Sequence, residues 1–224
     1  MMQTAWLTLL AIVSAIIHLR AEYLGPEWQI YVFKPLTMVL ILLMAVRVEK
    51  PVSSLYKRWI AVALGLSLIG DVLLMLPADL FLPGLVVFLL AQVVYVAAFW
   101  LDSPHERGTK WAPIPYVFYG VIVFSLLLPG LNGMQIPVLF YVVVICLMGW
   151  LAFRRWWMLR NAAALLAAIG AACFIISDTA LAVNRFLQSF EAAPALVLVS
   201  YYFAQWLLAR SVESGTELGR GESG

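Results

Sequence analysis

The stretch FLPGLVVFLLAQVVYVAAFWL, residues 81–101, contains no charged side chain. A transmembrane helix needs about 20 mostly apolar residues to cross the hydrocarbon core of a bilayer. The stretch shows no alternation of apolar and polar residues, which favours a helix over a strand. The segments on either side, LPAD (76–79) and DSPHERG (102–108), are typical of turns. The sequence therefore predicts a membrane-spanning helix over Phe81–Leu101.

The rest of the chain has the same character. Of its 224 residues, 64% are hydrophobic and only 12% are charged, about half the charge of an ordinary soluble domain, and the mean hydropathy is +0.97. We expect an all-α polytopic membrane protein in which residues 1–210 form one bundle and residues 211–224 form a polar, disordered tail. The first apolar run lacks both a basic segment before it and a clear small-residue cleavage site, so it is predicted to be a retained span. Eight spans are predicted: Thr4–Leu19, Trp28–Val46, Trp59–Leu76, Phe81–Leu101, Ile114–Leu128, Pro137–Phe153, Asn161–Val183 and Pro194–Arg210.

The distribution of Lys and Arg predicts the orientation. With the N-terminus in the cytoplasm, only Arg20 and Arg185 lie on the outer side, and Lys34 falls within a span. The positive-inside rule then places both termini in the cytoplasm, and the short loops favour a bacterial inner membrane. The other eleven basic residues are expected at the cytoplasmic surface: Arg47, Lys50, Lys57, Arg58, Arg107, Lys110, Arg154, Arg155, Arg160, Arg210 and Arg220.

Three charged residues interrupt the predicted spans. Each costs on the order of 3 kcal/mol inside a bilayer, so their retention calls for a reason. Lys34 lies about two turns after the outer start of its span, and Asp71 and Asp178 each lie about two turns before the outer ends of theirs. All three are therefore expected in one layer of the outer half of the membrane, where they would form a shared site.

Polar side chains are expected to accompany these charges. Taken singly, each is explained by an ordinary hydrogen bond between helices, and together they favour a polar cavity inside the bundle. His18 reaches a similar depth but is predicted to be an interfacial residue. The candidates are Gln92 and Tyr95 on the fourth span, Asn184 beyond Asp178, and Tyr201, Tyr202 and Gln205 on the eighth.

A faint internal repeat links the two carboxylates. GDVLLM followed by FLLAQVVY is similar to SDTALA followed by YYFAQWLL. The similarity suggests two weakly related halves, each supplying one carboxylate and one amide. Transporters also contain such repeats, so this pattern does not by itself indicate an enzyme.

The two carboxylates have a structural and a catalytic interpretation. One of them could pair with Lys34 as a packing clamp, but this leaves the other unexplained. A carboxyl group in an apolar surrounding tends to hold its proton, and a neutral acid beside an ionised one is suited to acid–base catalysis. Two Asp and at most His18, with Lys34 nearby to repel a cation, do not supply the His-rich ligands of a zinc hydrolase, so we expect neither a metal nor an organic cofactor. No phosphate-binding loop, G-x-S-x-G motif or nucleic-acid-binding pattern is present.

Several segments together resemble the YhhN-type membrane family, which includes the lysoplasmalogenases. The resemblance runs from the second predicted span to the eighth and implies an eight-span fold. It also implies hydrolysis of the vinyl ether bond of lysoplasmalogens, which releases a fatty aldehyde and a glycerophospho-alcohol such as glycerophosphoethanolamine or glycerophosphocholine. The family often has His at the position of Gln92, so this departure argues against a role that needs an imidazole there. The segments are FKPLTMVLILL, GDVLLMLP, FLPGLVVFLLAQVVYVAAF, GAACFIISDTALAVNRF and YYFAQWLL.

Vinyl ether hydrolysis fits a pair of carboxyl groups. A general acid would protonate the β-carbon, and a carboxylate would stabilise the resulting cation and activate water. The hypothesis makes Asp71 and Asp178 this pair without deciding which is the acid, and Lys34 either keeps one Asp ionised or binds the lipid phosphate. The expected partners are a lysophospholipid substrate and membrane lipids. Two alternatives stay open: a transporter that uses the buried charges as a proton relay, and hydrolysis of a different lysolipid bond.

Overall fold

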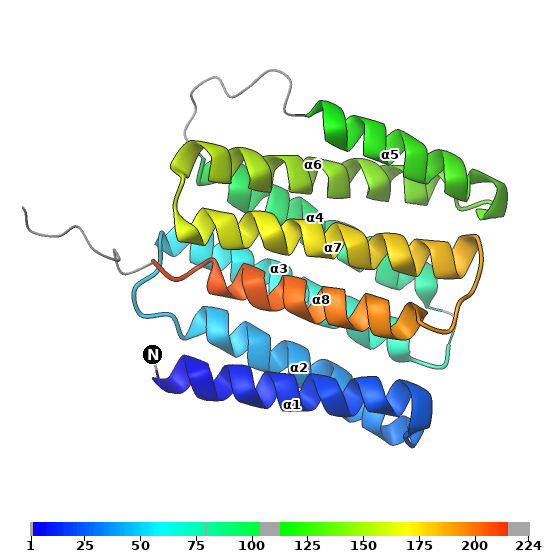
Figure 1. The fold of residues 1–224 in the computed structure, drawn as a ribbon, viewed down its shortest axis with the longest axis horizontal. Coiled ribbons are helices and arrows are strands. Elements are labelled where there is room, and N and C mark those ends of the chain that lie inside the picture. Colours follow the sequence, from blue (N-terminus) through cyan, green and yellow to red (C-terminus); the bar gives the residue numbers. More distant parts are fainter. Residues whose placement is uncertain (1, 79, 104–112, 215–224) are drawn as a thin grey trace, which may run out of the picture.

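The chain folds into helices throughout the part that the computed structural model describes, which is residues 2–78, 80–103 and 113–214 (Figure 1). Within these ranges the only β-type pairing is an isolated antiparallel bridge between Pro51 and Glu213. The α-helices are α1 (Met2–Leu24), α2 (Glu27–Val46), α3 (Ser54–Met75), α4 (Phe81–Leu101), α5 (Ile114–Leu127), α6 (Gln135–Leu159), α7 (Ala162–Phe186) and α8 (Ala193–Arg210), and a short 3-10 turn, η1 (Leu128–Gly130), follows α5.

Local chemistry explains where several helices begin and end. The Ser53 hydroxyl accepts a hydrogen bond from the Tyr56 backbone N–H at the start of α3. The Asn161 side chain does the same for the Ala164 N–H, at 2.8 Å, at the start of α7. Such caps satisfy backbone donors that have no partner inside the helix. Helix α6 ends at Leu159, and the capping residue Arg160 takes the left-handed conformation with φ 49°.

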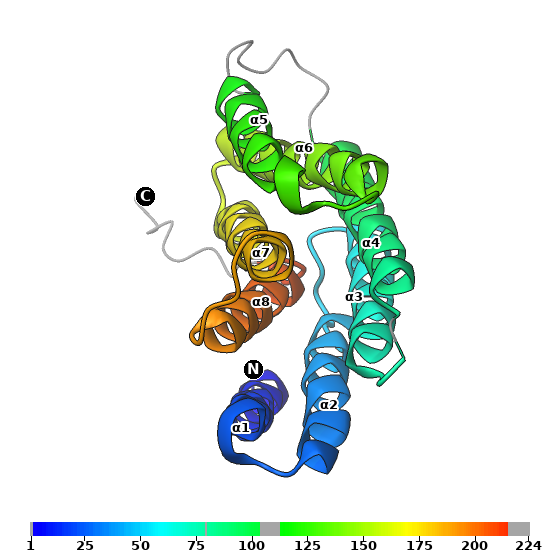
Figure 2. The same ribbon diagram turned by 90° about the vertical axis from the view of Figure 1, so that its right-hand side faces the viewer.

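Viewed end-on, α3 and α4 form one side of the bundle and α7 and α8 form the other (Figure 2). The pairs α1–α2 and α5–α6 lie at opposite ends of this arrangement. Helix α8 contacts α1, α2 and α3, and α7 contacts α6 and α5. The α7–α8 hairpin therefore connects the two ends of the bundle and faces α3 and α4 across its interior.

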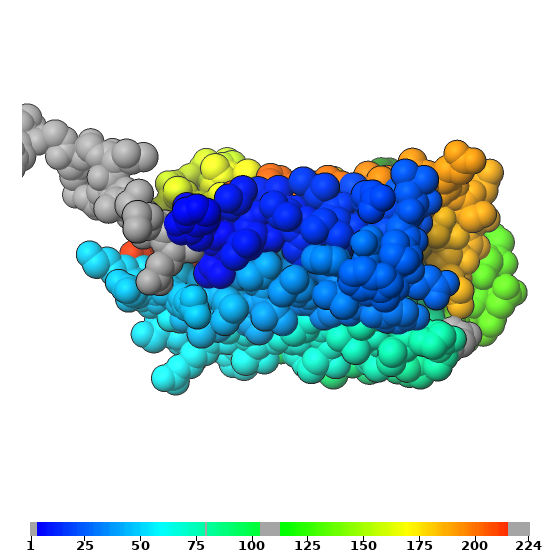
Figure 3. All heavy atoms as spheres, turned by 90° about the horizontal axis from the view of Figure 1, so that it is seen from below, coloured from blue at the N-terminus to red at the C-terminus, as the bar shows by residue number. Residues whose placement is uncertain are grey.

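The outer surface is that of a multi-pass helical membrane protein. Six of the described helices, α1, α2, α3, α4, α6 and α7, are long and apolar enough to cross a membrane, and Ile114–Gly130 is a shorter apolar segment. Large apolar side chains are exposed along α1, among them Trp6 at 62% and Ile16 at 60%. Figure 3 shows the face formed by α1 and α2. Apolar surface on this scale needs a lipid or protein partner.

Three predicted spans are shorter than their helices by five residues or more. Helix α1 continues past Leu19 to Leu24, α3 begins at Ser54 instead of Trp59, and α6 continues past Phe153 to Leu159. All three extensions contain charged residues, which end the apolar runs in the sequence but do not interrupt backbone hydrogen bonding.

The predicted polar tail begins with a packed segment. Ser211 and Val212 are fully buried, and the Val212 carbonyl accepts a hydrogen bond from the Val52 N–H at 2.9 Å. Residues 215–224 of the predicted tail, and the predicted loop residues 104–112 with Arg107 and Lys110, lie outside the described part of the chain.

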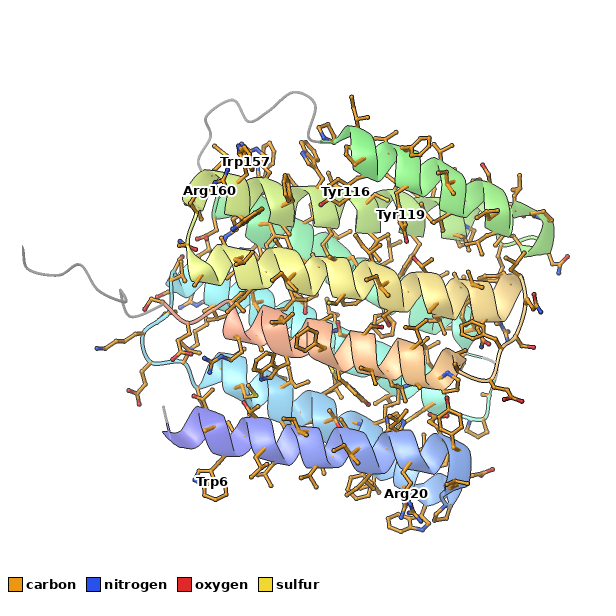
Figure 4. The ribbon with its side chains drawn as sticks, viewed as in Figure 1. Trp6, Arg20, Tyr116, Tyr119, Trp157 and Arg160 are labelled. Atoms are coloured by element: carbon orange, nitrogen blue, oxygen red, sulfur yellow. The ribbon has the colours of Figure 1, made fainter. Side chains whose placement is uncertain are left out.

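Arg160 and Arg20 lie at opposite ends of the bundle, as the predicted topology requires, whereas Arg155 does not lie at the surface. Figure 4 shows Arg160 and Trp157 at the end of the bundle where α1 begins, and Arg20 at the opposite end. Arg155, predicted at the membrane surface, is instead fully buried. Its guanidinium donates two hydrogen bonds to Asp102 Oδ2, at 2.9 and 2.7 Å, and lies 4.3 Å from the centroid of the Tyr56 ring. The nearby carboxylate makes this burial tolerable.

Candidate active site

A small cavity inside the bundle contains all three of the charged residues that interrupt the helices. It has a volume of about 110 Å³ and is lined by residues of α2 to α8. Lys34 comes from α2, Asp71 from α3 and Asp178 from α7. Most of the remaining wall is apolar, so the cavity is a polar centre enclosed by hydrocarbon and aromatic side chains. The apolar wall includes Leu74, Phe81, Leu85, Phe88, Val123, Leu127, Val138, Val142, Ile145, Phe186 and Leu198.

Asp71 lies beside a cation. Its side chain is almost fully buried, and its Oδ1 is 3.6 Å from Lys34 Nζ. Its Oδ2 accepts a hydrogen bond of 2.6 Å from the Tyr201 hydroxyl on α8. The ammonium group balances the charge of the carboxylate in a region that water does not solvate freely. These contacts suit an ionised Asp71.

Asp178 has neutral partners. Its Oδ2 accepts hydrogen bonds from Gln92 Nε2 on α4, at 3.0 Å, and from the Tyr141 hydroxyl on α6. Among the described residues, no Lys, Arg or His forms an ion pair with Asp178. A carboxyl group in this setting is easier to keep protonated than one that has a cation beside it.

Aromatic rings hold the walls of the cavity in place. The Phe88 ring packs edge-on against Tyr201 and Phe174, with centroid distances of 6.0 and 6.5 Å. Gly70, which precedes Asp71, allows this approach, because a Cβ there would lie 2.7 Å from the Phe88 ring. The absence of a side chain at Gly70 thus lets α4 pack directly beside the Asp71 carboxylate.

A second polar layer lies next to the cavity. The Tyr95 hydroxyl donates a hydrogen bond of 2.8 Å to Gln205 Oε1, and both side chains are fully buried. Neither residue lines the cavity. Their bond links α4 to α8, the helices that carry Gln92 and Tyr201, so Tyr95 and Gln205 can fix the position of these two residues.

Two other residues predicted at the site, Tyr202 and Asn184, lie elsewhere, as does His18. Tyr202 points toward α1, where its hydroxyl is 2.8 Å from His18 Nδ1, and His18 Nε2 is 3.1 Å from Glu22. Asn184 accepts a hydrogen bond from the Phe190 N–H, at 3.2 Å, and so stabilises the connection between α7 and α8. None of these side chains lines the cavity. His18 is fully buried rather than interfacial, because α8 covers it.

The model of the YhhN family matches residues 29–212. The chain belongs to the YhhN family. Proteins similar to this YhhN-family chain include the uncharacterized membrane protein YhhN of Escherichia coli O157:H7, which is 29% identical over 92% of this chain and 98% of its own length. The lysoplasmalogenase of Mycobacterium tuberculosis is 30% identical over 80% of this chain and 69% of its own length. Human lysoplasmalogenase TMEM86A is 34% identical over 70% of this chain and 66% of its own length. No solved structure matches the chain significantly.

The segment shared with the YhhN family coincides with the helices around the cavity. The match begins within α2 and ends just after α8, and the cavity is likewise lined only by α2 to α8. Helix α1 lies outside the matched segment and does not line the cavity; it packs against α2 and α8. What is common to the family therefore includes every helix that reaches the three charged residues.

Sequence reasoning missed two residues that contact or flank the carboxyl groups of this YhhN-family chain. Tyr141 donates to Asp178, and Thr179, beside it on α7, is hydrogen-bonded to Tyr119 of α5. Tyr141 lies about two turns into α6, at the depth of Lys34 in α2, so the argument from depth could have found it. Because the phenol ring of a tyrosine is usually counted as an apolar packing group, sequence reasoning did not consider Tyr141 as a hydrogen-bond donor.

Proposed function

We propose that this chain hydrolyses the vinyl ether bond of lysoplasmalogens, with Asp178 as the general acid and Asp71 as the general base. The observation that carries the proposal is that two carboxyl groups, one beside a cation and one beside neutral groups, line a single apolar cavity. The names of relatives about 30% identical to the chain support the same reaction.

The reaction can be written with every proton accounted for. Protonated Asp178 gives its proton to the β-carbon of the alkenyl chain, which leaves an oxocarbenium ion at the carbon bonded to the ether oxygen. The negative charge of Asp71 stabilises this cation, and Asp71 takes a proton from the water that adds to it. In the resulting hemiacetal, Asp178 removes the hydroxyl proton while Asp71 protonates the leaving glycerol oxygen. A fatty aldehyde and a glycerophospho-alcohol form, and both Asp residues return to their starting states.

The surrounding residues have supporting roles in this scheme. Lys34 keeps Asp71 ionised, and Tyr201 orients it. Gln92 and Tyr141 hold the Asp178 carboxyl in place by its Oδ2 atom. The scheme uses side chains of the protein and water alone. Within the described residues, no group of three or more His, Cys, Asp or Glu side chains is arranged to hold a metal ion.

The membrane arrangement proposed with this function has eight spans and both termini in the cytoplasm. Helix α8 is the most polar of the long helices around the cavity and is largely buried, and α5 with η1 forms the remaining short span. Cysteine introduced at Glu49 should then react with a membrane-impermeant reagent only in inverted vesicles, and cysteine at Glu191 only in intact spheroplasts. Labelling of both positions from one side would refute this topology.

The decisive experiment is hydrolysis by purified protein in detergent. Alkenyl lysophosphoethanolamine should yield an aldehyde and glycerophosphoethanolamine, both detected by mass spectrometry, while acyl and alkyl lysolipids should not be cleaved. A transporter would release no product in detergent, where no gradient exists. Cleavage of the acyl lipid instead would identify a hydrolase of a different bond.

A further inference from the structure

The central cavity is too small for a whole lysolipid. Its volume is about 110 Å³, whereas sites that enclose drug-sized ligands usually span roughly 300–1,000 Å³. The cavity can hold the reacting vinyl ether and a water molecule, and the long hydrocarbon chain must lie elsewhere. Two larger apolar grooves adjoin the cavity, and each shares one lining residue with it.

The first groove lies between α5 and α6 and has a volume of about 430 Å³. It shares Val142 with the cavity. Gly120 of α5 lies against Cys146 and Val142 of α6, since a Cβ at Gly120 would be 3.1 Å from Cys146 Sγ. The remaining lining is almost entirely hydrocarbon and aromatic, which is the surface that an alkenyl chain would contact.

The second groove lies between α1 and α8 and has a volume of about 320 Å³. It shares Leu198 with the cavity. Hydrogen bonds fix α1 to α8 along this groove: Trp206 donates to Thr8 at 3.3 Å, and His18 lies 2.8 Å from the Tyr202 hydroxyl. A buried polar pair thus stands at one end of this groove, which makes it a poor path for hydrocarbon.

Within the described residues, helix α5 has fewer polar attachments to its neighbours than α1 has to α8. It has 14 residues, and in the described part of the chain a single side-chain hydrogen bond, between Tyr119 and Thr179, joins it to another helix. Tyr116 and Tyr119 lie on the side of α5 toward α6 (Figure 4). Thr179 directly follows Asp178, so the one polar attachment of α5 is next to a cavity carboxyl group.

We propose that the groove between α5 and α6 binds the alkenyl chain of the substrate and that α5 moves aside to admit the lipid from the membrane. The inference rests on the proposed function and adds a specificity subsite to it. Val142 lines both the groove and the cavity, so a chain lying in the groove would pass Val142 with the carbons that follow the double bond and leave the vinyl ether itself between the two Asp residues. Opening α5 requires the loss of one hydrogen bond and of apolar contacts that lipid replaces.

A matched pair of variants tests the subsite. Val143→Phe narrows the α5–α6 groove, and Val199→Phe makes the same change in the α1–α8 groove. The two valines are 54% and 58% exposed, so both variants should fold. The measurement is kcat/KM for two alkenyl lysolipids, one with a short chain of about 6 carbons and one with a long chain of about 16 carbons. Only the long chain would reach the narrowed part of the groove, and a methylene that no longer fits its pocket lowers kcat/KM about tenfold or more.

Val143→Phe should lower kcat/KM for the long chain at least about tenfold and leave the short chain within about twofold, while Val199→Phe leaves both unchanged. An equal loss for both chains, no loss with Val143→Phe, or a chain-selective loss with Val199→Phe would overturn the proposal.

A binding readout separates this proposal from the proposed reaction. A lysolipid with a diazirine at the end of its chain should crosslink to α5 or α6, and Val143→Phe should weaken that crosslink. Crosslinking to α5 or α6 without any aldehyde release would refute the reaction and retain the groove. Aldehyde release with crosslinking confined to α1 or α8 would refute the groove between α5 and α6 and retain the reaction.

Discussion

Asp71 and Asp178 have nearly matching surroundings. Each carboxyl group accepts a hydrogen bond from one tyrosine hydroxyl, Tyr201 for Asp71 and Tyr141 for Asp178, and each has one nitrogen donor beside it. The nitrogen is the ammonium of Lys34 in one case and the amide of Gln92 in the other. The two sites therefore differ mainly by one positive charge. In the proposed reaction, that single charge decides which carboxyl group donates a proton and which accepts one.

Removing either carboxyl group should have the largest effect. Asp71→Asn and Asp178→Asn should each lower kcat for aldehyde release by roughly 10³-fold or more, because an amide can neither donate a proton to carbon nor accept one from water. Thermal unfolding in detergent serves as the control and should shift little. A folded Asn variant with more than about a tenth of normal activity would remove that residue from the mechanism.

Converting the charged site into a copy of the neutral one should have the next largest effect. Lys34→Gln should lower kcat about a hundredfold, because Asp71 without a cation would tend to hold a proton and could not act as a base. Lys34→Arg keeps the positive charge, so its kcat should fall much less. Equal losses in the two variants would mean that the shape of Lys34 matters and its charge does not.

The hydroxyl of Tyr201, which bonds to the ionised Asp71, should matter more for activity than the hydroxyl of Tyr141, which bonds to the neutral Asp178. Hydrogen bonds to charged groups contribute about 1.5–3 kcal/mol and those between neutral groups about 0.5–1.5 kcal/mol. Tyr201→Phe should therefore lower kcat more than Tyr141→Phe, by about tenfold or more against a few-fold. Steady-state kinetics on both variants decides the order, and a larger loss for Tyr141→Phe would reverse the assignment of acid and base.

The smallest effect is expected at Gln92. Gln92→His keeps a nitrogen donor for Asp178, so activity should stay within about twofold, while Gln92→Leu removes one neutral hydrogen bond and should lower activity a few-fold, as Tyr141→Phe does. Aldehyde release by the two variants, compared at equal protein concentration, measures this difference. A His variant as poor as the Leu variant would show that the amide has a role beyond donating one hydrogen bond.

Much of the fold follows from composition and run length. Long apolar runs separated by turn residues predict the helices, and the ends are missed where, as in α6, the helix continues into charged residues at Arg154 and Arg155. The sequence does not say how each helix is rotated about its axis. Arg154 and Arg155 therefore look equivalent in sequence, although Arg155 alone is fully buried, against Asp102.

The site was partly predictable for a similar reason. Depth along the helix is encoded by position, and that argument selects Lys34, Asp71 and Asp178, which the structure brings to one cavity. Pairing between helices is not encoded in this way. The internal repeat suggests one amide for each carboxylate, yet Gln92 reaches Asp178 while Gln205 bonds to Tyr95.

The cavity lies close to one end of the bundle. Phe81, the first residue of α4, and Phe186, the last of α7, both form part of its wall. For the proposed reaction this position sorts the products. The water-soluble glycerophospho-alcohol has only about a turn of helix to cross before it reaches solvent on the side away from the chain termini. The aldehyde remains dissolved in the hydrocarbon, so the enzyme would deliver its two products to different compartments.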